Sequence, residues 1–178
     1  FSKACWTPRQ LLERIQLIRD QGYAIAMTAG NFDPLHEGHL DAFEQARVLI
    51  GHARGTLPRQ VAIVVAVDAD EDVASQKPGR PVRPLASRLM HLAAIEGVAT
   101  VIPFKGGKTG PLIKLVQPDG FFKGSDRTWS GTPERRDLTR YKTPFFRVER
   151  RLNISSSRII QDELVVAVIK DGSGPDHI

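Results

Sequence analysis

A run of seven apolar residues at 61–67 (VAIVVAV) constrains the fold of this chain more than any other stretch. The run is rich in β-branched residues and has no polar face, which is typical of a strand buried on both sides. Such strands belong to parallel sheets, because each right-handed βαβ crossover lays a helix over the sheet. The run therefore predicts an α/β protein in which this segment is a central strand.

Shorter apolar runs and helical patterns alternate on either side of this strand. Further strands are predicted at 23–28, 98–104, 120–123 and 144–148, and helices at 8–21, 40–50, 85–93, 112–116 and 155–164. Strands separated by helices imply a parallel sheet covered on both faces. We expect a Rossmann-like sheet of about five strands, with ligands bound beyond the carboxyl ends of the strands.

The length of 178 residues predicts a single domain. We expect an N-terminal helix at 8–21, a core at 23–164 and a C-terminal tail at 165–178. Two polar excursions interrupt the pattern, at 52–60 and at 124–143. The second is too long to be a mere connection, so we expect it to cover a bound ligand or to join a dimer.

Apolar runs and cysteine content indicate the compartment in which the protein is expected. No apolar run reaches the roughly 18 residues needed to cross a bilayer, so no membrane partner is expected. The first residues lack the long apolar stretch of a secretory signal. Cys5 is the only cysteine, which excludes an intrachain disulfide and a Cys-rich zinc site. We expect a cytoplasmic protein.

The formal net charge of +5 is concentrated in one segment. Residues 123–158 hold ten Lys or Arg against four acids, with Trp129 and other aromatics interleaved. A basic stretch of this kind indicates phosphate groups, nucleic acid or an acidic surface as a partner. A nucleic-acid-binding protein is one interpretation, because cations bind phosphates and aromatic rings stack on bases.

Two histidines after the predicted strand at 23–28 form the most informative pattern. His36 and His39 are three residues apart, with Gly38 between them, where a helical pattern begins. Both imidazoles then project from one face of a first helical turn, where free N–H groups and the helix dipole favour an anion. The pair predicts a phosphate site. Zinc is the competing interpretation, although two histidines supply only two ligands.

The tetrad His36-Glu37-Gly38-His39, which follows Gly30-Asn31-Phe32-Asp33, resembles the H-x-G-H hallmark of the cytidylyltransferase-like nucleotidyltransferase superfamily. Ile154-Ser155-Ser156-Ser157 resembles a second signature of that superfamily, which opens its last helix. The resemblance covers about 28–164. It implies an enzyme that transfers a nucleoside monophosphate from a nucleoside triphosphate to a small phosphorylated acceptor and releases pyrophosphate.

Within the superfamily, the stretches 64–70 (VVAVDAD), 79–88 (GRPVRPLASR) and 118–126 (PDGFFKGSD) resemble the ADP-heptose synthase adenylyltransferase domain more than glycerol-3-phosphate cytidylyltransferase. ATP with a sugar or polyol phosphate is therefore favoured, and CTP with glycerol phosphate or a phosphonate is the alternative. Two departures leave the base and the acceptor open: Ala29-Gly30-Asn31 replaces a usual N-G-C, and Ser155-Ser156-Ser157 replaces S-T-T.

The resemblance, with the chemistry of the residues, assigns roles to individual positions. The expected catalytic residues are His36, His39, Lys77 and Ser156. The expected nucleotide-binding residues are Ala29, Gly30, Asn31, Phe32, Gly38, Lys123, Gly124, Asp126, Arg150, Ser155, Ser156 and Ser157. The expected acceptor-binding residues are Asp33, Asp70 and Arg88.

Two of these expectations have a physical basis. Lys77 lies in a turn-rich loop and is expected to close over the triphosphate as a lid. Arg88 is expected to clamp a phosphate through its bidentate fork. Mg²⁺ is the expected cofactor, held mainly by the triphosphate and not by protein ligands. A homodimer that binds no nucleic acid is expected.

Overall fold

One parallel sheet organises the part of the chain that the computed structural model describes, residues 3–76, 78–125, 127–149 and 151. Its strands lie in the order β3-β2-β1-β4-β5, and every neighbouring pair is parallel. They are β1 (Ala24–Gly30), β2 (Val61–Asp68), β3 (Val98–Phe104), β4 (Gly120–Gly124) and β5 (Phe145–Val148). All five predicted strands are present, and the Rossmann-like α/β fold is confirmed.

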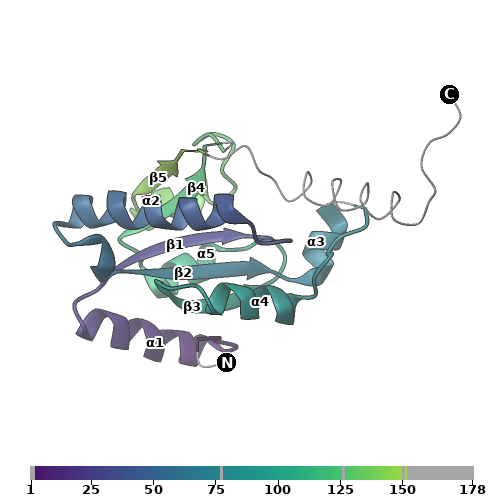
Figure 1. Ribbon diagram of the computed structural model, residues 1–178, viewed down its shortest axis with the longest axis horizontal. Helices are drawn as coiled ribbons and strands as arrows, with labels where there is room; N and C mark the ends of the chain where they lie inside the picture. The colour runs from purple at the N-terminus through teal and green to yellow at the C-terminus, as the bar shows by residue number, and fades with distance from the viewer. Residues whose placement is uncertain (1–2, 77, 126, 150, 152–178) are drawn as a thin grey trace, which may run out of the picture.

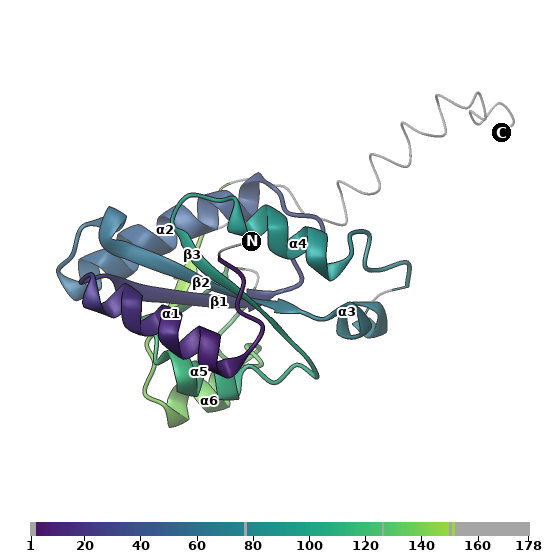
Figure 2. The same ribbon diagram turned by 90° about the horizontal axis from the view of Figure 1, so that it is seen from below.

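Helices cover both faces of this sheet (Figure 1, Figure 2). One face carries α2 (Glu37–Arg54) and α4 (Leu85–Ala93), and the other carries α1 (Pro8–Asp20), α5 (Gly110–Val116) and α6 (Arg135–Arg140). A short helix, α3 (Asp70–Gln76), follows β2 and extends beyond the end of the sheet (Figure 1). The helix predicted at 155–164 lies outside the described residues.

The central strand β2 shows why two layers form. All of its residues are buried. Side chains alternate along a strand, so Ile63 and Val65 pack on the side of α2 and α4, while Val64 and Ala66 pack on the side of α1 and α5. The burial of this segment on both faces, inferred from its composition, is confirmed.

Three segments differ from the expectation. No helix was predicted for the acidic stretch after β2, but it forms α3, whose first turn places three acids at the favourable end of the helix dipole. The excursion expected at 52–60 begins inside α2, which runs to Arg54 and ends at Gly55 with φ of 65°. The excursion at 124–143 contains α6, which is anchored by the buried Leu138.

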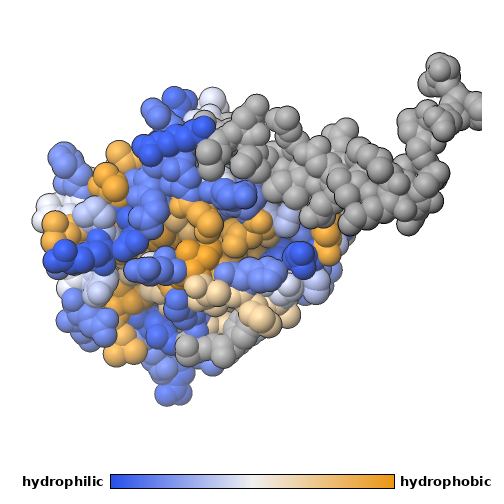
Figure 3. All heavy atoms as spheres, viewed as in Figure 1, coloured by the Kyte–Doolittle hydropathy of each residue, from blue (hydrophilic) through white to orange (hydrophobic). Residues whose placement is uncertain are grey.

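The outer surface mixes charged and apolar side chains on the face that carries α2 (Figure 3). Its exposed apolar residues include Leu40, Val48 and Leu49 of α2. Within the described ranges, no helix combines the length and the apolar character needed to cross a membrane.

Candidate active site

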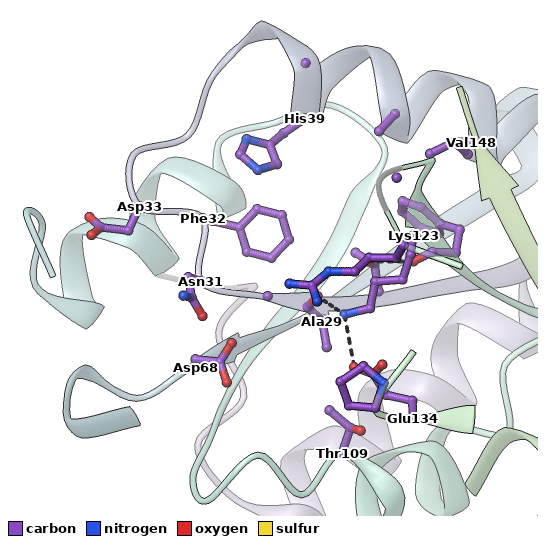
Figure 4. Close-up of a pocket in the computed structure, with 18 of the residues that line it drawn as sticks. Ala29, Asn31, Phe32, Asp33, His39, Asp68, Thr109, Lys123, Glu134 and Val148 are labelled. Atoms are coloured by element: carbon purple, nitrogen blue, oxygen red, sulfur yellow. Dashed lines mark hydrogen bonds and ion pairs between the residues drawn. The ribbon is translucent and has the colours of Figure 1, made fainter. Parts of the chain in front are cut away.

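A cavity of about 480 Å³ lies at the carboxyl ends of the strands (Figure 4). The chain runs from β1 outward to β2 and β3, and then returns to the opposite side of β1 as β4. The sheet therefore changes direction between β1 and β4, which is where ligands bind in open α/β sheets. Thr28 of β1 and Lys123 of β4 both line the cavity.

Ten of the residues singled out from the sequence line this cavity. They are Ala29, Gly30, Asn31, Phe32, Asp33, His36, Gly38, His39, Lys123 and Gly124. Asp70 and Arg88 are described but do not line it. Lys77, Asp126, Arg150, Ser155, Ser156 and Ser157 lie outside the described residues.

The two histidines lie together at the start of α2. His36 is the N-cap residue, in extended conformation, and His39 is the third residue of the helix. The Nδ1 atom of His39 accepts a hydrogen bond from the backbone N–H of His36 at 3.2 Å. The ring centroids of the two imidazoles are 3.8 Å apart, and Phe32 packs against His39 at 5.0 Å. Because Nδ1 of His39 is an acceptor, the proton of the neutral ring resides on Nε2, which can donate to a ligand.

Burial, and then the neighbouring His36, lower the pKa of His39 to about 3. The unfolded chain then binds a proton at this position near pH 6.5, whereas the folded protein does so only near pH 3. The contribution of neutral His39 to stability is therefore complete above about pH 6.5 and is lost as the pH falls toward 3.

The free energy of unfolding of the wild-type protein should fall as the pH is lowered from 6.5 to 4. We expect this fall to be less steep in His39→Gln. The difference in slope should approach about 1.4 kcal/mol per pH unit, the value for one proton. Urea unfolding across this pH range measures it. His52→Gln, at an exposed position in the last turn of the same helix, is the control. Equal slopes for wild type and His39→Gln would show that His39 does not have a lowered pKa.

Asp33 anchors a neighbouring loop, and its carboxylate is already engaged. Its side chain is almost completely buried. Oδ2 accepts from the backbone N–H of Val82 at 2.8 Å, and Oδ1 accepts from that of Arg83 at 2.9 Å. Oδ2 also lies 3.2 Å from Nη1 of Arg80. These contacts hold the 80–83 loop against the cavity, so positioning of that loop is the function of Asp33 that the geometry supports.

Arg88 was expected to bind a phosphate, but it does not line the cavity. Its side chain is fully buried, its Nε donates to the Arg83 carbonyl, and its Nη1 donates to the Asn31 carbonyl. Its Nη2 donates to the Asp68 carbonyl and to the Asp70 carboxylate. Four of the five N–H groups of the guanidinium are thus used within the protein. In this structure no pair of N–H groups remains for the expected phosphate clamp, and Arg88 joins three segments behind the cavity.

Asp70, the second expected acceptor-binding acid, also serves these internal contacts. One of its carboxylate oxygens pairs with Arg88 at 2.7 Å, and the other accepts from the backbone N–H of Leu85 at 3.1 Å, at the start of α4. The acid from this region that does line the cavity is Asp68, the last residue of β2. Asp70 opens α3 with its carboxylate directed to Arg88 and the start of α4, whereas Asp68, Val73 and Gln76 line the cavity.

Several side chains on the cavity wall were not expected from the sequence. Asp68, Thr109, Arg127 and Glu134 line the cavity without having been expected there. Burial raises the pKa of the Asp68 carboxyl, against the opposing effect of the nearby Lys123 ammonium. The position of Asp68 at the carboxyl end of the central strand was a usable signal. Nothing local marks Glu134, which reaches the cavity only because the excursion at 124–143 folds back.

Lys123 connects β1, β4 and the excursion. Its Nζ donates to the Ala29 carbonyl at 2.7 Å and forms an ion pair with Oε1 of Glu134 at 3.0 Å (Figure 4). Phe121 and Phe122, beside it in β4, are buried in the two cores. Two of the aromatic rings interleaved with the basic residues of this segment are therefore core residues and do not lie on the surface.

The described side chains offer little for direct metal binding. In the part of the chain that the structure describes, no group of three or more His, Cys, Asp or Glu residues could hold a metal ion. His36 and His39, the pair behind the zinc interpretation, are packed ring to ring at 3.8 Å.

The sequence is similar to known proteins of one family. The family model described as cytidylyltransferase-like matches residues 27–162. The bifunctional protein HldE of Halorhodospira halophila is 41% identical over 117 residues, which are 65% of this chain and 22% of that protein. The HldE of Desulfatibacillum aliphaticivorans is 32% identical over 167 residues, which are 93% of this chain and 31% of that protein. The chain thus spans between a fifth and a third of these relatives.

A solved structure supports the fold independently. The lipopolysaccharide core biosynthesis protein from Thermoplasma volcanium superposes with a TM-score of 0.54 at 21% sequence identity. The match covers 71% of this chain and 97% of that one. At this identity the likeness concerns the fold alone.

Proposed function

Because the chain belongs to the cytidylyltransferase-like family and is therefore a nucleotidyltransferase, we propose that it transfers a nucleoside monophosphate to a sugar or polyol phosphate. ATP is the favoured donor, and pyrophosphate is the second product. The relatives named HldE and the resemblance of 64–70, 79–88 and 118–126 to the ADP-heptose synthase adenylyltransferase domain support this choice. CTP with glycerol phosphate or a phosphonate is the alternative that remains within the same family.

The observation that carries the proposal is the pair of imidazoles at the start of α2, facing a cavity at the switch point of the sheet. In nucleotidyl transfer, an acceptor phosphate attacks the α-phosphorus in line while pyrophosphate leaves. Positioning and neutralisation of charge do most of the work in such reactions. His36 and His39 would bind the triphosphate, with Nε2–H of His39 donating to an oxygen on which charge develops.

Mg²⁺ belongs to this proposal as part of the Mg–triphosphate substrate. It would neutralise phosphate charge. Lys77, Asp126, Arg150 and Ser155–Ser157 keep their expected roles as proposals. A homodimer is also proposed, and sedimentation analysis tests it.

Pyrophosphate release across a matrix of substrates tests the function. Four nucleoside triphosphates should be combined with a heptose 1-phosphate, a hexose 1-phosphate, glycerol 3-phosphate and an alkyl phosphonate, each with Mg²⁺. We expect release with ATP and a sugar phosphate to exceed every other pair. Strongest release with CTP and glycerol 3-phosphate would select the alternative, and no release with any pair would refute both.

A further inference from the structure

One part of the cavity wall is formed jointly by α2 and β5, which lie side by side (Figure 1). Ala42 and Phe43 of α2 line the cavity, as do Val148, the last residue of β5, and Glu149, which follows it. Phe43 and Val148 are buried in the same core. The position of the carboxyl end of β5 relative to α2 therefore determines the shape of the cavity on this side.

The side chain of Gln45 joins these two elements. β5 is the outermost strand of the described sheet, and its pairing with β4 ends at Val148. Beyond that point, Nε2 of Gln45 donates to the Glu149 carbonyl at 2.9 Å, and Oε1 of Gln45 accepts from the Glu149 N–H at 2.9 Å. A primary amide carries a donor and an acceptor side by side, so it presents to Glu149 the two groups that a neighbouring strand would present.

Asp41, one turn earlier on α2, fixes the orientation of this amide. Its Oδ2 accepts from Nε2 of Gln45 at 2.8 Å, and its Oδ1 lies 3.7 Å from Nη1 of Arg151. Both N–H groups of the amide are therefore used, one by Asp41 and one by the Glu149 carbonyl. Gln45 is only 7% exposed, so water competes little for these bonds. A flipped amide would lose all three of them.

Gln45 is not among the residues that line the cavity, so it can act on a bound substrate only through the segment that it holds. We propose that Gln45 is a positioning residue of the active site, which holds the carboxyl end of β5 against the helix that carries His36 and His39. The proposal rests on the function proposed above and adds to it a residue that the sequence motifs do not include.

Steady-state kinetics of Gln45→Met test this role. Methionine is unbranched and of similar length, but it cannot donate to the Glu149 carbonyl or to Asp41. Misalignment of reacting groups lowers the rate more than the affinity, because correct alignment matters most in the transition state. We expect kcat for pyrophosphate release to fall by roughly tenfold or more. The acceptor KM and the Kd of a non-hydrolysable ATP analogue should each change by less than about threefold.

Two controls distinguish positioning from a general loss of stability. Glu44→Gln alters the neighbouring residue of α2, whose side chain is 63% exposed, and should leave kcat unchanged. Ile18→Val removes one methyl group from a buried residue of α1, on the other face of the sheet, and should lower Tm without affecting the contact between α2 and β5. Every variant is assayed well below its own Tm, so that it is folded.

Gln45→Glu provides a second variant that keeps the shape of the side chain. At about pH 8 its carboxylate can still accept from the Glu149 N–H, but it faces the Glu149 carbonyl and the Asp41 carboxylate without a proton to donate. We expect kcat to fall at least as far as in Gln45→Met.

Three outcomes would overturn the proposal. They are a near-native kcat in both folded variants, a fall in kcat no larger than that of Ile18→Val, and a raised acceptor KM with kcat retained. None of these results would affect the proposed nucleotidyl transfer, which the wild-type substrate matrix tests separately.

Discussion

Replacing His39 by alanine is expected to lower turnover by about a hundredfold or more, with the fold retained. His39 presents Nε2–H to the cavity because its Nδ1 is fixed by the backbone N–H of His36. Loss of one preorganised donor to developing charge commonly has an effect of this size. The measurement is kcat for pyrophosphate release with the best substrate pair, alongside circular dichroism to verify folding.

His52→Ala serves as the matched control for this substitution. His52 lies in the last turn of the same helix and is exposed, so its loss should leave kcat unchanged. If His39→Ala retained near-native turnover while folded, the histidine pair would not lie at the reacting phosphates, and the cavity would need another chemical interpretation.

Replacing Arg88 by methionine is expected to have the largest effect on stability. Methionine fills much of the same space but donates no hydrogen bonds. The Asn31 and Asp68 carbonyls and the Asp70 carboxylate would lose their buried partner. Removing one member of a buried ion pair costs about 3–5 kcal/mol. For a domain of this size, Tm should fall by roughly 10 °C.

Thermal unfolding of Arg88→Met, measured in parallel with Arg9→Met, distinguishes a positioning role of Arg88 from a phosphate clamp. Arg9 forms an exposed pair with Glu13, so its replacement should leave Tm unchanged. An unchanged Tm for Arg88→Met, with a raised KM for the acceptor, would restore the phosphate clamp inferred from the sequence. A fall in Tm supports the positioning role.

The strands were predictable because each is an apolar run between polar segments. The strand at 61–67 could be recognised from its own residues, since it is buried on both faces and is apolar throughout. Helices α3 and α6 were not predicted, and each buries a single side chain, Val73 and Leu138 respectively. One buried residue leaves no helical periodicity to detect.

The part of the site that lies on a single loop and the helical turn after it was predictable. His36 and His39 are neighbours on a first helical turn, so their meeting follows from spacing alone. Glu134 reaches the cavity by long-range packing, which local sequence does not encode. The position of Arg88 behind the cavity was not predicted for a related reason: arginine is seldom fully buried, and its acceptors come from three separate segments, at Asn31, at 68–70 and at Arg83.

The most direct test of the account follows the α-phosphorus itself. ATP labelled at the α-phosphorus is incubated with the protein, Mg²⁺ and the best sugar phosphate, and the products are separated and identified. If the protein transfers a nucleotidyl group, the label appears in a diphosphate that joins the nucleoside to the sugar, with unlabelled pyrophosphate as the other product. Label that stays in ATP, or that appears only in AMP, would contradict nucleotidyl transfer.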